Sequence, residues 1–214
     1  MSTRQEPILW IQLLGLGFIP LEFLLLKLVL AGAPVGPIPT IQRIIIMVIA
    51  IITPTIVLFK NPADWASFLF FKLPLKGRSV SQHQINNLQL HFFLPKICFL
   101  AGVIILISCF WFIDKSALLL ADISPFHNFS RIINLFFAIP LLFLIVWQWH
   151  QLCFSIWLLT RSEDILKASE YLPTKQILAN QLCLGLDAKC FSQLNFSSSS
   201  FPTAVNKNQS SKKD

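Results

Sequence analysis

Charged residues are scarce in this chain of 214 residues: they make up 13% of it, with 17 Lys or Arg and 10 Asp or Glu. Soluble domains carry about 25% charged residues. Tyrosine is almost absent as well, with one Tyr against 20 Phe and six Trp, so the aromatic side chains are nearly all apolar. With 55% hydrophobic residues, a soluble fold of this size could not hide its apolar surface from water. The composition excludes soluble, disordered and collagen-like classes and leaves an integral membrane protein.

Motifs that carry enzyme chemistry are also missing. No phosphate-binding glycine loop, nucleophile elbow or HExxH occurs, and the seven Gly are dispersed. The five Cys form no CxxC and no metal-type Cys/His spacing, so we expect reduced, buried thiols. They are Cys98, Cys109, Cys153, Cys183 and Cys190. Lys and Arg are scattered rather than gathered into a basic stripe. We therefore predict a protein that is not an enzyme, has no cofactor or metal, and binds neither nucleic acid nor an identifiable small-molecule substrate.

The chain does have long apolar runs. Four of them can supply about 20 helical residues, the length that crosses a hydrocarbon core of about 30 Å. Because the runs are continuous and do not alternate with a period of two, they predict helices rather than barrel strands. The predicted spans cover about 8–30, 41–58, 97–113 and 132–155. The fold class is all-α: a polytopic helical membrane protein with four transmembrane helices, embedded in the lipid bilayer. Gly15 and Gly17 are interpreted as small residues that allow close helix packing.

The spans divide the chain into a transmembrane domain, 1–159, a helical segment, 160–194, and a low-complexity polar tail, 195–214, which we expect to be disordered. A connection over 60–95 separates the second and third spans. Four spans place both termini on one side, and this connection and the segment after the last span carry more Lys and Arg than the opposite loops. The positive-inside rule then predicts an integral, multi-pass protein with both termini in the cytoplasm.

Short amphipathic helices are expected in the cytoplasmic connection. Asn61 followed by Pro62 is typical of a helix start and predicts a short apolar segment that lies in the headgroup region. Ser81 and Gln84 have capping-box spacing and predict a second helix. We expect this second helix to pack on the inner face of the bundle through an apolar stripe. The stripe consists of Ile85, Leu88 and Phe92.

Glu22 and Lys27 are the formal charges that lie well inside a predicted span. Ionisable groups within a membrane are functional candidates by default, although Lys27, within one turn of the span end, can extend to the surface. An ionised carboxylate alone in hydrocarbon is costly, so Glu22 needs a partner or a proton. Counting depth at about 1.5 Å per residue, we predict that Glu22 faces the second span and is hydrogen-bonded to Arg43 directly or through water.

His150, near the inner end of the fourth span, has two interpretations. Surrounded by Trp and Gln, it fits an inner aromatic belt at headgroup level. A haem ligand would need a second His at matching depth on another span, which only His91 could supply. Asp114, Asp122 and His127 are assigned to the outer loop, where we expect them to be solvated.

Two stretches resemble a known family. The first is Arg4–Ile11 (RQEPILWI), followed by Leu14–Leu16 (LGL) at the start of the first span. The second runs from 160 to 177 and ends in ASEYLPTKQI. Both are similar to the cyanobacterial group called low-complexity tail membrane proteins. The resemblance implies a multi-span protein of the plasma or thylakoid membrane, and it implies no established activity and no catalytic residues.

These features favour a scaffold or accessory subunit that presents cytoplasmic helices and a flexible tail to a larger membrane protein complex. The alternative is a small transporter or channel component that uses Glu22 in the first span. Transport would require discontinuous helices around a polar site, and Pro20, Pro54 and Pro140 are the positions that could break a helix.

Overall fold

The computed structural model describes residues 7–31, 38–69, 71–74, 78, 80–126, 128–161, 165, 169 and 173–187. Within them, four long apolar helical segments fit membrane spans: Pro7–Ala31, Pro39–Lys60, Leu94–Ala117 and Arg131–Leu159. Each contains the span predicted from its apolar run and extends beyond it at both ends. The fold class is confirmed, and the low-complexity tail lies outside the described residues.

The elements follow one another with two interruptions inside spans. The first span consists of α1 (Pro7–Leu14), a 3₁₀ turn (Gly15–Gly17) and α2 (Phe18–Ala31). The second consists of α3 (Pro39–Met47), a π-helical turn (Val48–Ile52) and α4 (Thr53–Lys60). The third is α6 (Leu94–Ala117) with a 3₁₀ turn (Leu118–Leu120), and the fourth is α7 (Arg131–Leu159). Outside the spans lie β1 (Phe71–Lys72), α5 (Val80–His91), α9 (Thr174–Asn180) and β2 (Leu186–Asp187).

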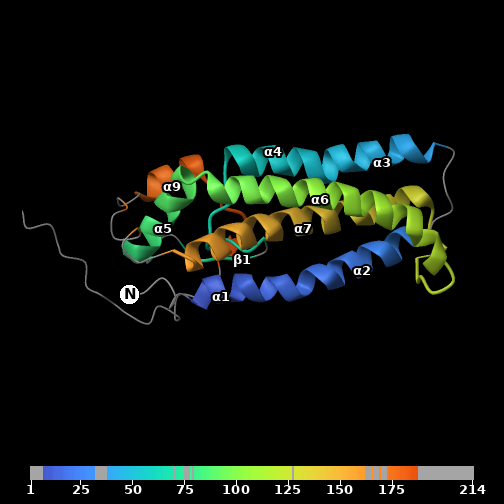
Figure 1. Ribbon diagram of the computed structural model, residues 1–214, viewed down its shortest axis with the longest axis horizontal. Coiled ribbons are helices and arrows are strands. Elements are labelled where there is room, and N and C mark those ends of the chain that lie inside the picture. The colour runs from blue at the N-terminus through green and yellow to red at the C-terminus, as the bar shows by residue number, and fades with distance from the viewer. Residues whose placement is uncertain are drawn as a thin grey trace, which may run out of the picture.

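Helix α7 lies at the centre of the bundle, where it contacts α1, α2, α4 and α6. In Figure 1, α2 and the α3–α4 pair lie on opposite sides of α6 and α7. Buried side chains from several spans form the core, among them Leu26, Phe99, Phe110 and Leu142. The outside of the bundle is also apolar: Leu14, for example, is 71% exposed. Such a surface suits lipid, which solvates apolar side chains as well as the protein interior does.

The π-helical turn in the second span follows from Pro54. Proline has no N–H, so it cannot bond the carbonyl one turn before it, and the helix must adjust. The N–H of Thr53 bonds the carbonyl of Val48, five residues back, and the Thr53 hydroxyl donates to the same oxygen at 2.8 Å. The Thr55 hydroxyl donates to Ile51 O at 2.6 Å. The break expected at Pro54 therefore occurs, but it is local.

Glycine contacts differ from those expected. Gly15 packs against Gln148 of α7, where an added Cβ would lie 2.9 Å from the amide nitrogen. Around Gly17 an added Cβ would meet nothing within 4 Å among the described residues, so the packing role predicted for Gly17 is wrong. The tightest helix contact is instead at Gly102 of α6, where a Cβ would overlap the indole of Trp149. Gly102 allows α6 and α7 to approach closely.

A folded cap covers one end of the bundle. We define the cap as the described residues of 61–74, helix α5 and residues 173–187. The main-chain N–H of Asp64 donates to Leu182 O at 3.1 Å, and that of Leu182 donates to Pro62 O at 3.0 Å. Strands β1 and β2 pair in parallel, with Phe71 opposite Leu186. The cap therefore joins residues that are far apart in the chain, because 118 positions separate Asp64 from Leu182.

The prediction of a helix that starts at Asn61–Pro62 is wrong. The segment 61–69 is not helical, and its residues 62–67 are all buried rather than spread over a headgroup surface. Its main-chain groups bond to residue 182 and to side-chain amides from the spans and from α5. Tertiary hydrogen bonds have overridden the local helix signal, because a buried backbone group without a partner is costly.

Helix α5 is present as predicted, but it begins at Val80, one residue before Ser81, so Ser81 lies inside the helix and is not its N-cap. Its apolar stripe is buried as expected, with Ile85 and Leu88 packed near Leu9 and Trp65. The opposite face, however, is buried too. Gln89 Nε2 donates to Ala63 O at 2.6 Å, so Gln89 bonds another part of the cap rather than water.

Candidate functional site

An ion triad lies at the end of the bundle opposite the cap. Asp114 of α6 accepts hydrogen bonds from Arg131 of α7, with Nη2 at 3.0 Å from Oδ1, and from Nε of Arg43 of α3. The Asp114 side chain is fully buried, and those of the two arginines are 8% and 12% exposed. Arg131 Nε also donates to Gln42 Oε1 at 3.1 Å. The triad therefore ties three of the four spans together.

Two predictions about these residues are wrong. Asp114 is not solvated, because α6 continues to Ala117 and keeps the carboxylate on the helix, facing its neighbours. Arg43 does not bond Glu22 but pairs with Asp114. The reason is the order of the spans: α2 and α3 lie on opposite sides of α6 and α7, so Glu22 and Arg43 do not face each other (Figure 1).

The triad and the cap lie at opposite faces of the bundle, about one hydrocarbon thickness apart. Twenty helical residues separate Asp114 from Leu94 on α6, and the same number separates Arg131 from Gln151 on α7. At about 1.5 Å per residue these separations are about 30 Å, the thickness of a hydrocarbon core. We call these faces the triad side and the cap side.

Buried polar groups stabilise the cap internally and also hold it on the bundle. Arg78 pairs with Asp64 through two hydrogen bonds, of 2.9 and 2.6 Å, and both side chains are fully buried. Gln151 Nε2 of α7 donates to Asp64 O at 2.9 Å and to Ser67 O at 3.1 Å, and Gln12 of α1 donates to Trp65 O. Non-helical backbone at membrane depth needs such protein donors, because lipid offers none.

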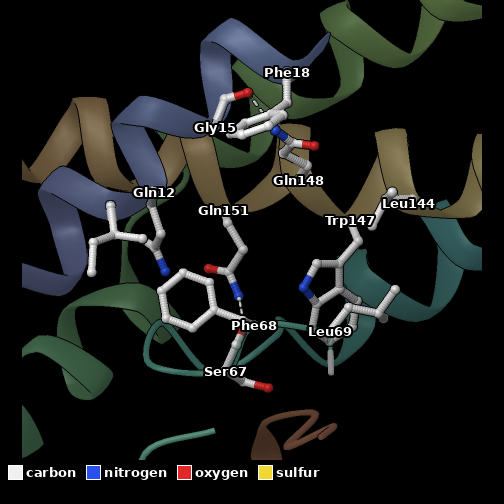
Figure 2. Close-up of a pocket in the computed structure, with 11 residues that line it drawn as sticks. Gln12, Gly15, Phe18, Ser67, Phe68, Leu69, Leu144, Trp147, Gln148 and Gln151 are labelled. Carbon is white, nitrogen blue, oxygen red and sulfur yellow. Dashed lines mark hydrogen bonds between the residues drawn. The ribbon is translucent and has the colours of Figure 1, made fainter. Parts of the chain in front are cut away.

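A cavity of about 260 Å³ lies where α1, α7 and the segment 67–69 meet (Figure 2). Its apolar lining includes Phe18, Phe68 and Leu144. Its polar lining consists of Gln12, Ser67, Gln148 and Gln151. The lining residues that the structure describes are all uncharged, so the cavity presents amide, hydroxyl and indole groups within an otherwise apolar wall.

The remaining intramembrane candidates do not converge on one site. Glu22 is half-buried on α2, and its Oε2 has no hydrogen-bond partner among the residues that the structure describes. Lys27 is half-buried next to Leu28, whose carbonyl accepts a hydrogen bond from Ser124 at the triad-side end. Neither side chain reaches the triad or the cavity lining.

His150 faces the interior rather than a lipid-facing aromatic belt. It is 8% exposed and packs edge-on against Phe99, with ring centroids 5.1 Å apart. Because α7 is central, its Trp, His and Gln side chains point into the bundle. The side chain of His91, the expected second ligand, lies outside the described part. In that part, no three His, Cys, Asp or Glu side chains group closely enough to hold a metal ion.

Two cysteines that are far apart in sequence meet on neighbouring helices. The Sγ atoms of Cys98 on α6 and Cys153 on α7 lie 3.6 Å apart. Cys153 is buried as expected, whereas Cys98 is exposed. No spacing rule could have found this pair, because the register of α6 against α7 decides it.

We expect oxidation with copper phenanthroline to join Cys98 to Cys153 in a disulfide. Each thiol gives an electron to the oxidant and a proton to water, and the two sulfurs need to move little to bond. Peptide mapping by mass spectrometry should identify the linked peptides. Cys98→Ser should abolish the link, and Cys109→Ser, on the same helix, should not. A link from Cys153 to Cys109 would contradict the helix register.

The sequence reasoning missed the glutamines that hold the cap and line the cavity. Gln12, Gln148 and Gln151 lie within or at the ends of apolar runs, where an uncharged polar side chain is itself a signal of helix contact. Asp114 and Arg131 also carried a signal, because each lies at the end of a predicted span on the same side of the membrane.

The low-complexity tail membrane protein-like family matches residues 5–192, which include the four spans and the cap. The chain belongs to this family. The match confirms the resemblance drawn from Arg4–Ile11 and 160–177. As a low-complexity tail membrane protein-like chain it is a multi-pass membrane protein of an uncharacterised family. We found no match to it among curated proteins or solved structures.

Proposed function

We propose that this protein is a non-enzymatic accessory subunit of a larger membrane protein complex, and that the cap contacts the partner. The observation that supports this is the surface of the cap. Phe71 on β1, Leu178 on α9 and Leu186 on β2 are each more than half exposed, although the cap beneath them is fixed by buried hydrogen bonds. Exposed apolar side chains on a rigid frame are typical of a protein interface.

The hydrogen bonds that buried glutamine side chains donate to the cap support the same proposal. Gln12, Gln89 and Gln151 donate to main-chain carbonyls of 63–67, so these carbonyls are occupied rather than left to coordinate a passing ion. Such bonds hold the cap in one conformation before binding. A preorganised surface loses less conformational entropy when it meets its partner.

The charge of the cap end supports a cytoplasmic position for it. Lys60, Lys72, Lys96 and Arg161 all lie at this end of the described chain. Basic residues beside span ends favour the cytoplasmic side. We place the proposed partner contact on that side.

Purification in a mild detergent tests the proposal. We expect the wild-type protein to elute with a second protein in fixed stoichiometry. Leu186→Glu should release this chain as a free subunit, because a buried charge at an apolar contact is costly. Ile123→Glu, an equally exposed position at the triad side, should leave the complex intact. A particle that contains this chain alone would contradict the proposal.

Glu22 favours one second candidate, a small transporter or channel component. Its carboxylate oxygen lacks a partner within the described residues, and the first span is interrupted at Gly15–Gly17, within two turns of it. Ion flux through vesicles that contain only this chain would favour transport over an accessory role.

A further inference from the structure

Two buried polar atoms beside the cavity between α1 and α7 are left without partners. They are the indole nitrogen Nε1 of Trp147 and the amide oxygen Oε1 of Gln151, and neither bonds any residue that the structure describes. Trp147 is 3% exposed and Gln151 is 4% exposed, and both line the cavity. An unsatisfied buried donor or acceptor costs about 1–3 kcal/mol. One free donor and one free acceptor at the same cavity point to a ligand that supplies the complementary pair.

Three other polar groups of the cavity are already in use as donors. Gln12 Nε2 donates to Trp65 O, and Gln148 Nε2 donates to Gly15 O. The hydroxyl of Ser67 donates to Leu184 O. Trp147 and Gln151 therefore carry the buried polar atoms of the described lining that are left for a ligand. They are four residues apart on α7, which places them on the same face of the helix.

The position of the cavity determines how a ligand reaches it. Trp147 lies 16 residues from Arg131 on α7, or about 24 Å from the triad side, and Gln151 lies at about 30 Å. The polar atoms are therefore at the depth where lipid heads meet acyl chains on the cap side. Ile11 and Phe18, which line the cavity, are 44% and 59% exposed on the lipid-facing surface. A ligand can enter from the bilayer with its apolar tail left among the lipid chains.

Charge and size narrow the chemistry further. The described lining residues carry no charge, so a phosphate or carboxylate head would be left without a counter-ion. At about 260 Å³ the cavity is below the usual range for whole drug-sized ligands, roughly 300–1,000 Å³, and suits a head group. A hydroxyl is the neutral group that both accepts and donates.

We propose that this cavity binds the hydroxyl-bearing head of an uncharged lipid-soluble molecule. Trp147 Nε1 donates to a head oxygen, and a head hydroxyl donates to Gln151 Oε1. A glycerolipid of the bilayer and a lipid-soluble hydroquinone share this chemistry. The inference does not depend on whether the cap contacts a protein partner.

Thermal unfolding of the full-length protein tests the site, in a detergent whose head carries no hydroxyl. A ligand that binds the folded state raises the unfolding temperature in a saturable way. We expect 1-monooleoylglycerol to do so, and methyl oleate, which has no donor, not to. Trp147→Phe keeps the ring but removes the N–H, and should weaken the apparent affinity about 5- to 10-fold. Trp149→Phe is the matched control, because its indole nitrogen is also without a partner within the described chain but lines a different cavity.

A second variant separates binding from folding. Ile11→Trp changes a lipid-exposed side chain and fills the entrance, so it should block binding while the unliganded unfolding temperature stays that of the wild type. Decylhydroquinone distinguishes a hydroquinone from a glycerolipid as the ligand. If decylhydroquinone raises the unfolding temperature in a Trp147-dependent way and 1-monooleoylglycerol does not, the site is supported and is assigned to hydroquinones. Equal shifts with methyl oleate, equal affinity of Trp147→Phe, or no shift with either hydroxylated ligand would overturn the proposal.

Discussion

Asp114→Asn is expected to remove most of the folded protein. The substitution keeps the shape of the side chain but leaves Arg43 and Arg131 with no carboxylate in a buried position. Breaking a buried ion pair on one side costs about 3–5 kcal/mol, which is a large part of a total stability of about 5–15 kcal/mol. The measurement is the fraction that elutes as a monodisperse peak after extraction, together with its unfolding temperature.

Two further variants make the Asp114 result specific. Asp122→Asn removes an exposed carboxylate from the same end of the protein and should leave both measurements unchanged. Combining Asp114→Leu with Arg43→Met and Arg131→Met removes all three charges and should recover much of the folded protein, because an apolar cluster often replaces a buried ion network without loss. If the triple variant is no better than Asp114→Asn, charge compensation is not what the triad provides.

Arg78→Met should unfold the cap. Asp64 would then keep a fully buried carboxylate with no cation, again at a cost of about 3–5 kcal/mol. The damage should be local, since α6 and α7 hold the spans together without the cap. We expect limited proteolysis to cut within 61–91 at enzyme concentrations that leave the wild type intact, while the four spans stay protected.

Two controls accompany Arg78→Met. One removes a positive charge from another position, and the other removes both charges of the Arg78–Asp64 pair. Lys60→Met removes an exposed cation from the end of α4 and should not alter the proteolysis pattern. Asp64→Asn added to Arg78→Met removes the stranded charge and keeps an oxygen for the N–H of Ala66, so protection should partly return. Cleavage of Arg78→Met at the wild-type rate would show that the pair is not needed to keep the cap folded.

Several features followed from the sequence because they depend only on distance along the chain. Each apolar run of about 20 residues has one way to satisfy its backbone in lipid, which is a helix. Span number and approximate span ends could therefore be predicted, as could the presence of α5, which begins at Val80, one residue before Ser81.

Tertiary structure decided everything that depends on which helices are neighbours. Glu22 and Arg43 have depths that would permit pairing, but α6 and α7 lie between their helices, and Asp114 takes the arginine instead. The non-helical path of 61–69 arises because residue 182 and three glutamines offer its backbone better partners than a helix would. Hydropathy records how deep a residue lies but not the direction it faces around its helix, and the direction determines each of these contacts.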